Sequence, residues 1–297
     1  GNTCLNTLNE EFSLLSSVAF IRAPNHTALN QFIYHYLTSD YGQRLIQSEI
    51  SGQAITRITL TKLKSFKLSF PSITEQQKIA SFFTVIDQKI SQLKHKKTLL
   101  EEYKKGVMQK IFSQEIRFKD DNGQEFPMWE KKKLGDAVDI IKGEQLNRNE
   151  LQSYWDYPCL NGGVEPSGYT DKYNTDENTI TISEGGNSCG YVNLMKTKFW
   201  CGGHCYKLVP KGLNTLYLYQ LLKHNEMKIM ELRVGTGLPN IQRKDIMRYQ
   251  LHVTTSPPEQ TKIANFLSAI DDKIKYAQMQ IEKALVWKRG LMQQMFV

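Results

Sequence analysis

The chain has 297 residues, a formal net charge of +8 and a sequence pI near 9.1, a length that suits about two domains. Its basic balance favours an anionic partner, although charge informs association and not fold. No run of about 18 apolar residues occurs, so we predict no membrane span. The five cysteines form an odd and sparse set, which is typical of free thiols in a reducing, cytoplasmic compartment.

The first part of the chain, residues 1–57, has the pattern of a globular domain. Residues 18–24 resemble residues 205–210, and in both places a helical stretch follows, here over residues 29–37. Counting back by the interval between the two copies places the start of the domain before Gly1. We therefore expect this part to be the C-terminal portion of a domain whose front is absent from the sequence.

A long helix is predicted over residues 74–112, which contain no proline and no glycine before Gly106. Its apolar residues recur every seven positions, and sustained heptads favour coiled-coil packing. Ser72 and Glu75 form a capping box at its start, and its length is on the order of 55 Å. Its outward lysines either form a solvated face or contact phosphate or an acidic partner. The positions expected to pair are Ile79, Phe82, Ile86, Ile90 and Leu93.

A mixed α/β domain is predicted over residues 120–248, where short strands alternate with loops rich in glycine and asparagine. The expected strands cover residues 137–141, 179–182, 190–193 and 204–209, and a helix follows over residues 216–228. The glycine pairs in the loops match neither a P-loop nor the dinucleotide fingerprint. We therefore predict no nucleotide cofactor, and glycine there most simply permits tight turns.

Polar and basic side chains gather in or beside the predicted loops. Arginine, lysine and asparagine are side chains that read base edges, and lysine and arginine also hold phosphates. This combination favours a nucleic-acid surface over an ordinary polar loop. The candidate contacts are Lys142, Asn147, Arg148, Asn161, Asn187, Tyr191, His204, Asn240, Arg243 and Lys244.

Cys201, His204 and Cys205 are close enough in sequence to raise the question of a metal site. Zinc sites normally show a clearer pair of ligand pairs. Buried free thiols beside a glycine turn are the favoured interpretation, so we predict no metal.

The second half of the chain repeats the first at an offset of about 184 residues, too long for a solenoid repeat of about 20–50 residues. Glu75 and Ile79 reappear as Glu259 and Ile263, and a second capping box begins the copied helix with Pro257 at its first position. Two such helices can pack against each other, and an antiparallel pair is the simplest arrangement. The pairing positions expected in the copy are Ile263, Phe266, Ile270 and Ile274.

The doubled signature Glu-Gln-x-Lys-Ile-Ala, at residues 75–80 and 259–264, resembles the specificity subunit of type I restriction-modification enzymes. Pro239-Asn240-Ile241 at the domain exit and the closing residues 288–296 are also similar, and the resemblance covers essentially the whole chain. It implies an α+β fold in which mixed α/β target-recognition domains are separated by two long antiparallel heptad helices, a coiled-coil spacer. The implied domains are residues 1–57, the C-terminal part of a first target-recognition domain; 58–119, a first spacer region with its long helix; 120–248, a second target-recognition domain; and 249–297, a second spacer region with its long helix.

The resemblance also implies a function. Each globular domain would read one half of a split double-stranded DNA target, and the helices would set the interval between the halves. Two methyltransferase subunits would dock for adenine methylation, and motor-nuclease subunits would complete the restriction complex. The chain itself carries no Asn/Asp-Pro-Pro-Tyr/Phe motif and no Walker lysine motif, so we expect a non-catalytic reader. The alternative is a coiled-coil protein-interaction adaptor without DNA binding.

Overall fold

The computed structural model describes residues 2–24, 26–50, 57–235 and 237–296. The chain divides into two compact units, unit 1 (Gly1–Leu99 and Ile274–Val297) and unit 2 (Leu100–Lys273). Each unit contains one end of both long helices, α4 (Ile73–Phe112) and α9 (Pro257–Met295). The two predicted long helices and the α+β class are therefore confirmed.

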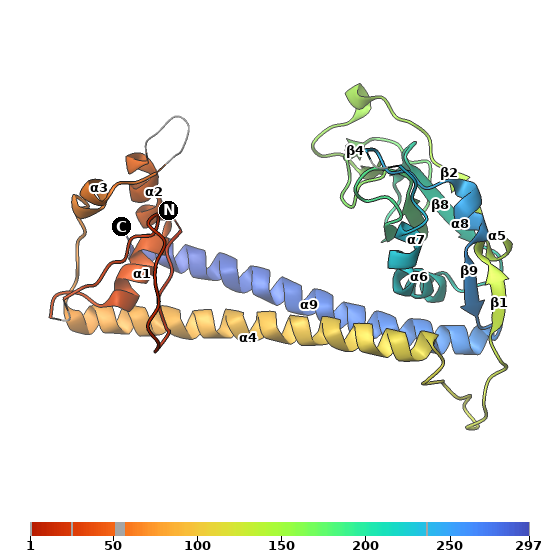
Figure 1. Ribbon diagram of the computed structural model, residues 1–297, viewed down its shortest axis with the longest axis horizontal. Helices are drawn as coiled ribbons and strands as arrows, with labels where there is room; N and C mark the ends of the chain where they lie inside the picture. Colours follow the sequence, from red (N-terminus) through yellow and green to blue (C-terminus); the bar gives the residue numbers. More distant parts are fainter. Residues whose placement is uncertain (1, 25, 51–56, 236, 297) are drawn as a thin grey trace. The chain divides into compact units, whose positions relative to one another are not determined.

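Unit 1 is a helical cluster built on the start of α4 and the end of α9, which lie side by side (Figure 1). α1 (Asn30–Thr38) packs against both helix ends, and α2 (Asp40–Glu49) and α3 (Leu60–Lys64) complete the unit. The core is aromatic: the rings of Phe32 and Phe83 lie 5.5 and 5.8 Å from that of Phe296. The helix predicted over residues 29–37 is confirmed as α1.

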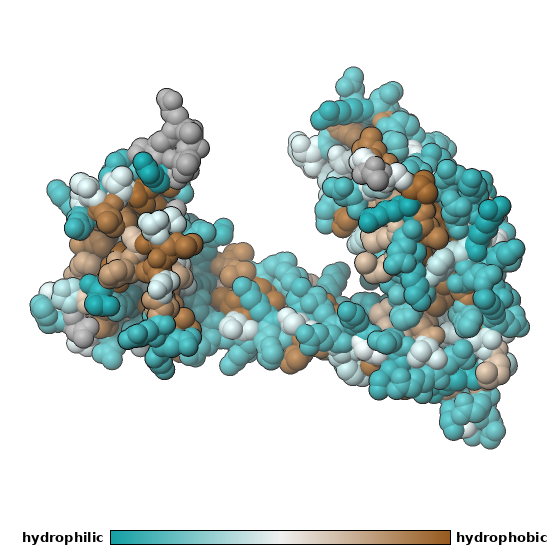
Figure 2. Space-filling view, viewed as in Figure 1, coloured by the Kyte–Doolittle hydropathy of each residue, from teal (hydrophilic) through white to brown (hydrophobic). Residues whose placement is uncertain are grey.

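Residues 18–24 form no strand within the described part of the chain, although they resemble the strand at residues 205–210. A strand exists only through hydrogen bonds to a neighbour, and no partner strand is described beside this segment. Figure 2 shows apolar surface gathered on unit 1, and several exposed side chains come from the N-terminal segment. They are Leu8, Phe12, Leu14, Leu15, Val18, Phe20 and Ile21.

The predicted pairing positions occupy different environments. In unit 1, Ile86, Ile90 and Leu93 are buried, and Ile79 and Ile274 are half-buried.

Phe82 is 41% exposed and meets Trp287 edge to face at 6.3 Å. In unit 2, Ile263 and Ile270 are buried, whereas Phe266 packs against Phe118 at 5.7 Å. Part of the α9 seam is therefore covered by the segment that follows α4.

A matched pair of ion pairs joins the two long helices. In unit 1, Lys288 Nζ lies 2.6 Å from Asp87 Oδ1, and in unit 2, Lys104 Nζ lies 2.7 Å from Asp271 Oδ1. The lysine side chains are only 13% and 15% exposed. Because each lysine near the end of one helix reaches an aspartate near the start of the other, the helices run antiparallel in both units.

The glutamines of the repeated signature fasten each long helix to a shorter one. Gln76 Oε1 accepts a hydrogen bond from the backbone N–H of Leu29, directly before α1, at 3.0 Å. Gln260 Oε1 accepts one from the backbone N–H of Asn214, directly before α6 (Thr215–His224), at 2.7 Å. Both glutamines are buried. The duplication is therefore preserved at the level of single hydrogen bonds.

The helix starts differ from the predicted capping boxes in one respect. Ser72 Oγ accepts a hydrogen bond from the backbone N–H of Glu75 at 3.3 Å, as expected. At the start of α9, the carboxylate of Glu259 instead accepts hydrogen bonds from Trp129 Nε1 at 3.1 Å and from Arg117 at 3.3 Å. The second capping box is therefore a wrong prediction, because a buried carboxylate forms stronger charge-assisted bonds with these partners.

Unit 2 contains the predicted mixed domain. One sheet has the antiparallel order β2-β8-β5-β6, a second pairs β1 with β9, and a third has the order β4-β3-β7. Its strands are β1 (Glu130–Lys133), β2 (Val138–Lys142), β3 (Tyr157–Leu160), β4 (Gly168–Thr170), β5 (Thr179–Ser183), β6 (Val192–Met195), β7 (Trp200–Cys201), β8 (Cys205–Pro210) and β9 (Gln250–Val253). Its shorter helices are α5 (Leu134–Ala137), η1 (Arg148–Glu150), α6, α7 (Glu226–Met230) and α8 (Arg243–Arg248).

The predicted helix over residues 216–228 is two helices, α6 and α7, separated at Asn225. The Asn225 side chain donates a hydrogen bond to the carbonyl of Leu221 at 2.8 Å, which satisfies a free group at the end of α6. Glu226 then accepts a hydrogen bond from the backbone N–H of Val192 at 2.9 Å and draws the chain toward β6. In the described part of the chain, no helix is both long and apolar enough to cross a membrane.

At His35 the two copies differ in whether the side chain can be protonated. Its second-copy equivalent is Gln220, which donates a hydrogen bond to Asp271 at 2.7 Å. His35 lies 3.9 Å from Asp87 and is 1% exposed. Burial and then Lys288 lower its pKa to about 4, and they outweigh the opposing effect of Asp87.

We expect His35→Gln to reduce the acid sensitivity of the fold. The unfolded chain binds a proton at His35 below pH about 6.5, whereas the folded chain does so only below about pH 4, so folding stability is lost as the pH falls through this window. The loss is at most about 3 kcal/mol. Urea unfolding at pH 7 and pH 4.5 measures it, with His95→Gln, an exposed histidine on α4, as the control. Equal pH dependence in wild type and His35→Gln would contradict the prediction.

Candidate nucleic-acid interface

Glu184, directly after β5, organises the polar loops of unit 2. Its carboxylate accepts hydrogen bonds from Lys142 Nζ at 2.6 Å and from the Tyr206 hydroxyl at 2.8 Å, and His204 Nδ1 lies 3.6 Å away. The Glu184 side chain is 8% exposed, whereas those of Lys142 and His204 are 53% and 63% exposed. A buried acid therefore holds two solvent-facing basic side chains in place.

The electrostatics of this group follow from its burial. Burial acts to raise the pKa of the Glu184 carboxyl, but the hydrogen bonds from Lys142 and Tyr206, with the nearby charges of Lys142 and His204, bring it below its ordinary value. Burial and the bond to Glu184 raise the pKa of Tyr206. Glu184 is therefore ionised and Tyr206 protonated at neutral pH, the states that this hydrogen-bond network requires.

The backbone of Glu184 also anchors the exit loop that leads into α8. Its carbonyl accepts a hydrogen bond from Ile241 N at 2.8 Å, and Gly185 forms a β-bridge with Asn240. Arg243 is close enough to Tyr206 to lower the pKa of its hydroxyl. The β5 loop and the exit loop are thus one assembly, and α8 starts beside it.

A second loop closes on the same assembly at Gly162, which adopts a φ of 86°. A side chain there would place its Cβ 2.6 Å from the carbonyl oxygen of His204, so glycine is required. Asn161 Oδ1 accepts a hydrogen bond from His204 N at 3.2 Å, and the Gly162 carbonyl accepts hydrogen bonds from the hydroxyls of Ser183 and Ser188. The glycine-rich loops are therefore turns that pack together.

The structure brings some of the ten candidate residues together and leaves others apart. Lys142, Asn161, His204 and Asn240 converge around Glu184, and Arg243 starts α8 beside them. The exposed residues Asn187 and Lys244 belong to the adjoining segments, the β5 loop and the first turn of α8.

The remaining candidates form separate contacts. Asn147 and Arg148 lie at η1, where Asn147 forms a capping box with Glu150. Tyr191 lies under Lys223 of α6, whose Nζ is 4.5 Å from the ring centroid. The backbone carbonyl of Tyr191 also accepts a hydrogen bond from Ser183 N at 3.0 Å, so Tyr191 adjoins the end of β5.

An aromatic–basic group near the β4-β3-β7 sheet was not found from the sequence. Lys198 Nζ lies 4.4 Å from the ring centroid of Tyr173 and donates a hydrogen bond to its hydroxyl, and Lys172 Nζ lies 5.7 Å from the ring of Trp200. The interleaving of lysine with aromatic residues at 169–173 and 196–200 is the signal that could have predicted it. Such side chains bind phosphates and stack on bases.

The cysteines lie apart from this polar surface. Cys201 and Cys205 are buried in an apolar cluster with Leu160, Met195 and Phe199. His204, between them in sequence, is exposed and faces Glu184 instead. Among the described residues no group of three or more potential metal ligands occurs. The favoured interpretation, buried free thiols beside a glycine turn, agrees with this placement.

Comparisons with known proteins identify relatives over most of the chain. The profile of the family described as type I restriction modification DNA specificity domain matches residues 6–102 and 128–285. A protein of Mycoplasma genitalium described as a type I specificity subunit is 37% identical over 157 residues, 52% of this chain and 41% of that protein. The specificity subunit described for the type I restriction enzyme MjaX of Methanocaldococcus jannaschii is 28% identical over 300 residues, 92% of this chain and 70% of that protein.

A solved structure, the S subunit of a type I restriction-modification system from M. genitalium, has the same fold, with a TM-score of 0.71, 21% identity, and coverage of 93% of this chain and 74% of that one. The chain spans about two fifths of the Mycoplasma relatives that it matches, 41% and 42% of their lengths. The predicted family is confirmed.

We expect Glu184→Gln to loosen the polar assembly. The amide keeps the shape but loses the charge that binds Lys142, so the free energy of unfolding falls by about 1–3 kcal/mol. The wild-type contribution is present above the ordinary carboxyl pKa and is lost as the pH falls through the lowered pKa of the folded chain. Urea unfolding measures both effects, with the exposed Glu177→Gln as the control. A loss no larger than that of the control would refute the role given to Glu184.

Proposed function

Since the chain belongs to the type I restriction modification DNA specificity family, we propose that it reads DNA as a non-catalytic subunit of a type I restriction-modification complex. The observation that carries the proposal is the convergence of Lys142, Asn161, His204 and Asn240 around the buried Glu184. Amide and cationic side chains held on a rigid support are what base edges and phosphates require. The net charge of +8 favours the same anionic partner.

The finer proposal concerns a target in two parts. The duplication supports it, because Gln76 and Gln260 attach a globular region to each copy of the helix in the same way. The two Asp–Lys pairs also join the two copies in the same way. In this proposal residues 1–57 and 120–248 belong to recognition domains, and residues 58–119 and 249–297 set the interval between the two parts of the target. Two methyltransferase subunits dock on the reader for adenine methylation, and motor-nuclease subunits join them for restriction.

The alternative, a coiled-coil adaptor that binds only protein, is distinguished by its behaviour with DNA. Phosphate contacts release counterions, so the affinity of a reader for DNA falls steeply as salt rises. An adaptor has no DNA affinity to lose. The exposed lysines Lys142, Lys198 and Lys244, together with Arg243, favour the reader.

Methylome sequencing tests the function in the cell. We expect a strain carrying the gene for this chain, with its methyltransferase partner, to show a split adenine-methylated motif that disappears when the gene alone is deleted. A methylome unchanged by the deletion would favour the adaptor.

We expect Arg243→Ala and Lys244→Ala each to weaken DNA binding of the chain in its methyltransferase complex. Both side chains are exposed in the first turn of α8 beside the Glu184 assembly. Loss of one phosphate contact lowers the slope of log affinity against log salt by about one unit. Titration of a duplex that carries the methylated motif, at several salt concentrations, measures this. Lys228→Ala, an exposed lysine on α7, is the charge-matched control. Unchanged affinity in both variants would remove the exit loop from the interface.

A further inference from the structure

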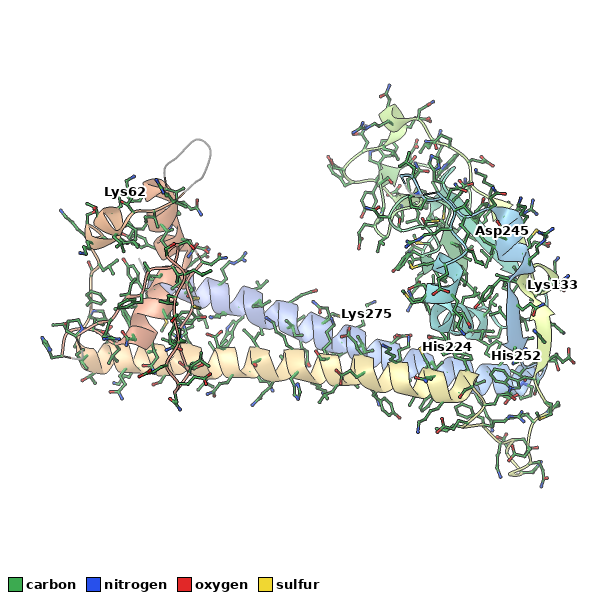
Figure 3. The ribbon with its side chains drawn as sticks, in the orientation of Figure 1. Lys62, Lys133, His224, Asp245, His252 and Lys275 are labelled. Carbon is green, nitrogen blue, oxygen red and sulfur yellow. The ribbon has the colours of Figure 1, made fainter. Side chains whose placement is uncertain are left out.

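In unit 2, the segment that follows α4 folds back onto the start of α9. Trp129 Nε1 and Arg117 both donate hydrogen bonds to the carboxylate of Glu259, at 3.1 and 3.3 Å, and the Glu259 side chain is 1% exposed. Directly after Trp129, β1 pairs antiparallel with β9, from Glu130 opposite Val253 to Lys133 opposite Gln250. Figure 3 labels Lys133 and His252 on this ladder. One extended segment thus supplies a strand, an indole N–H and a guanidinium to a single surface, which consists of β9 and Glu259 and is called the receiving surface below.

The duplication places the same receiving surface in unit 1. Aligned through Ile58 and Ile241, residues 67–70 correspond to β9, so Leu68 and Phe70 take the places of Leu251 and Val253. After the one-residue slip of the repeat, Glu75 takes the place of Glu259.

In the described part of the chain, the corresponding surface in unit 1 is only partly covered: Leu68 packs against the core, and the ring of Phe70 lies 6.0 Å from that of Phe32. Leu251 and Val253 are 3% and 0% exposed, whereas Phe70 is 40% exposed and residues 66–71 are in no strand. Glu75 is exposed, and among the described residues its carboxylate forms no ion pair, while Glu259 is buried. The backbone N–H and C=O groups of residues 67–70 are not paired in a strand, and such an edge can bind an added strand. A carboxylate near a helix start binds a cation or an N–H donor.

We infer that the edge formed by residues 67–70, together with Glu75, is a docking site for an extended peptide segment that carries arginine and tryptophan at the spacing of Arg117 and Trp129. The segment adds an antiparallel strand to the edge, and its indole N–H and guanidinium bind the Glu75 carboxylate. The occupied surface of unit 2 supplies the geometry and the side-chain chemistry of this occupant. The site involves no DNA contact and stands apart from the function proposed above.

A peptide with the sequence of residues 115–134, labelled with a fluorophore and added to the whole chain, tests the site. We expect saturable binding in fluorescence anisotropy and slower amide hydrogen exchange at residues 67–70. Glu75→Lys in the chain, or Trp129→Ala in the peptide, weakens binding by about tenfold or more. The peptide carries five basic and five acidic side chains, so a change of charge on the chain could alter its binding without any specific contact. Glu102→Lys, at an exposed glutamate of α4, is the charge-matched control and leaves binding unchanged.

Several results would overturn the inference. They are absence of binding at peptide concentrations up to about 1 mM, protection of residues 250–253 in place of 67–70, or an equal effect of Glu102→Lys. Sedimentation of the chain alone gives a further test. A dimer that Glu75→Lys dissociates would show that a second copy covers this edge, and not a free segment.

Discussion

The antiparallel register of α4 and α9 is the constraint on which the rest of the structure depends. In each unit a largely buried lysine reaches an aspartate on the other helix, Lys288 with Asp87 and Lys104 with Asp271. A buried charge without its partner is costly. A shift of either helix by one turn would therefore either expose both lysines to solvent or leave them buried without an aspartate. Heptad packing alone tolerates such shifts, because every layer of the seam offers a similar apolar surface. Within each unit, the ion pair therefore selects one register of the two helices.

In the Glu184 assembly, too, a buried charge fixes the positions of the groups that pair with it. A buried carboxylate cannot remain without partners, and Lys142 and Tyr206 satisfy it. His204, which lies in a loop outside any strand or helix, is thereby held at the surface. Variation of the surrounding exposed side chains would change what the surface contacts while the support stays the same. This separation of support from contact suits the proposed role as a reader of DNA.

Much of the architecture could be predicted because it repeats. The heptads of α4 and α9, the strands β2, β5 and β8, and the family signature were all visible in the sequence, and the structure confirms them. The sequence misled where tertiary contacts decide. Glu259 has the position of a capping residue, yet its carboxylate accepts hydrogen bonds from Arg117 and Trp129 instead. Lys172 and Lys198 were missed because their aromatic partners, Trp200 and Tyr173, are more than 20 residues away in the sequence.

The fastenings by Gln76 and Gln260 have an evolutionary consequence. Each glutamine accepts a hydrogen bond from a backbone N–H, which every residue except proline offers, and not from a particular side chain. A globular module from a related chain that begins a helix at the position of Leu29 or Asn214 can therefore attach to α4 or α9 through the same hydrogen bond. Exchange of a globular module between related chains at these junctions would then leave its attachment to α4 or α9 intact, whatever side chains the new module carries.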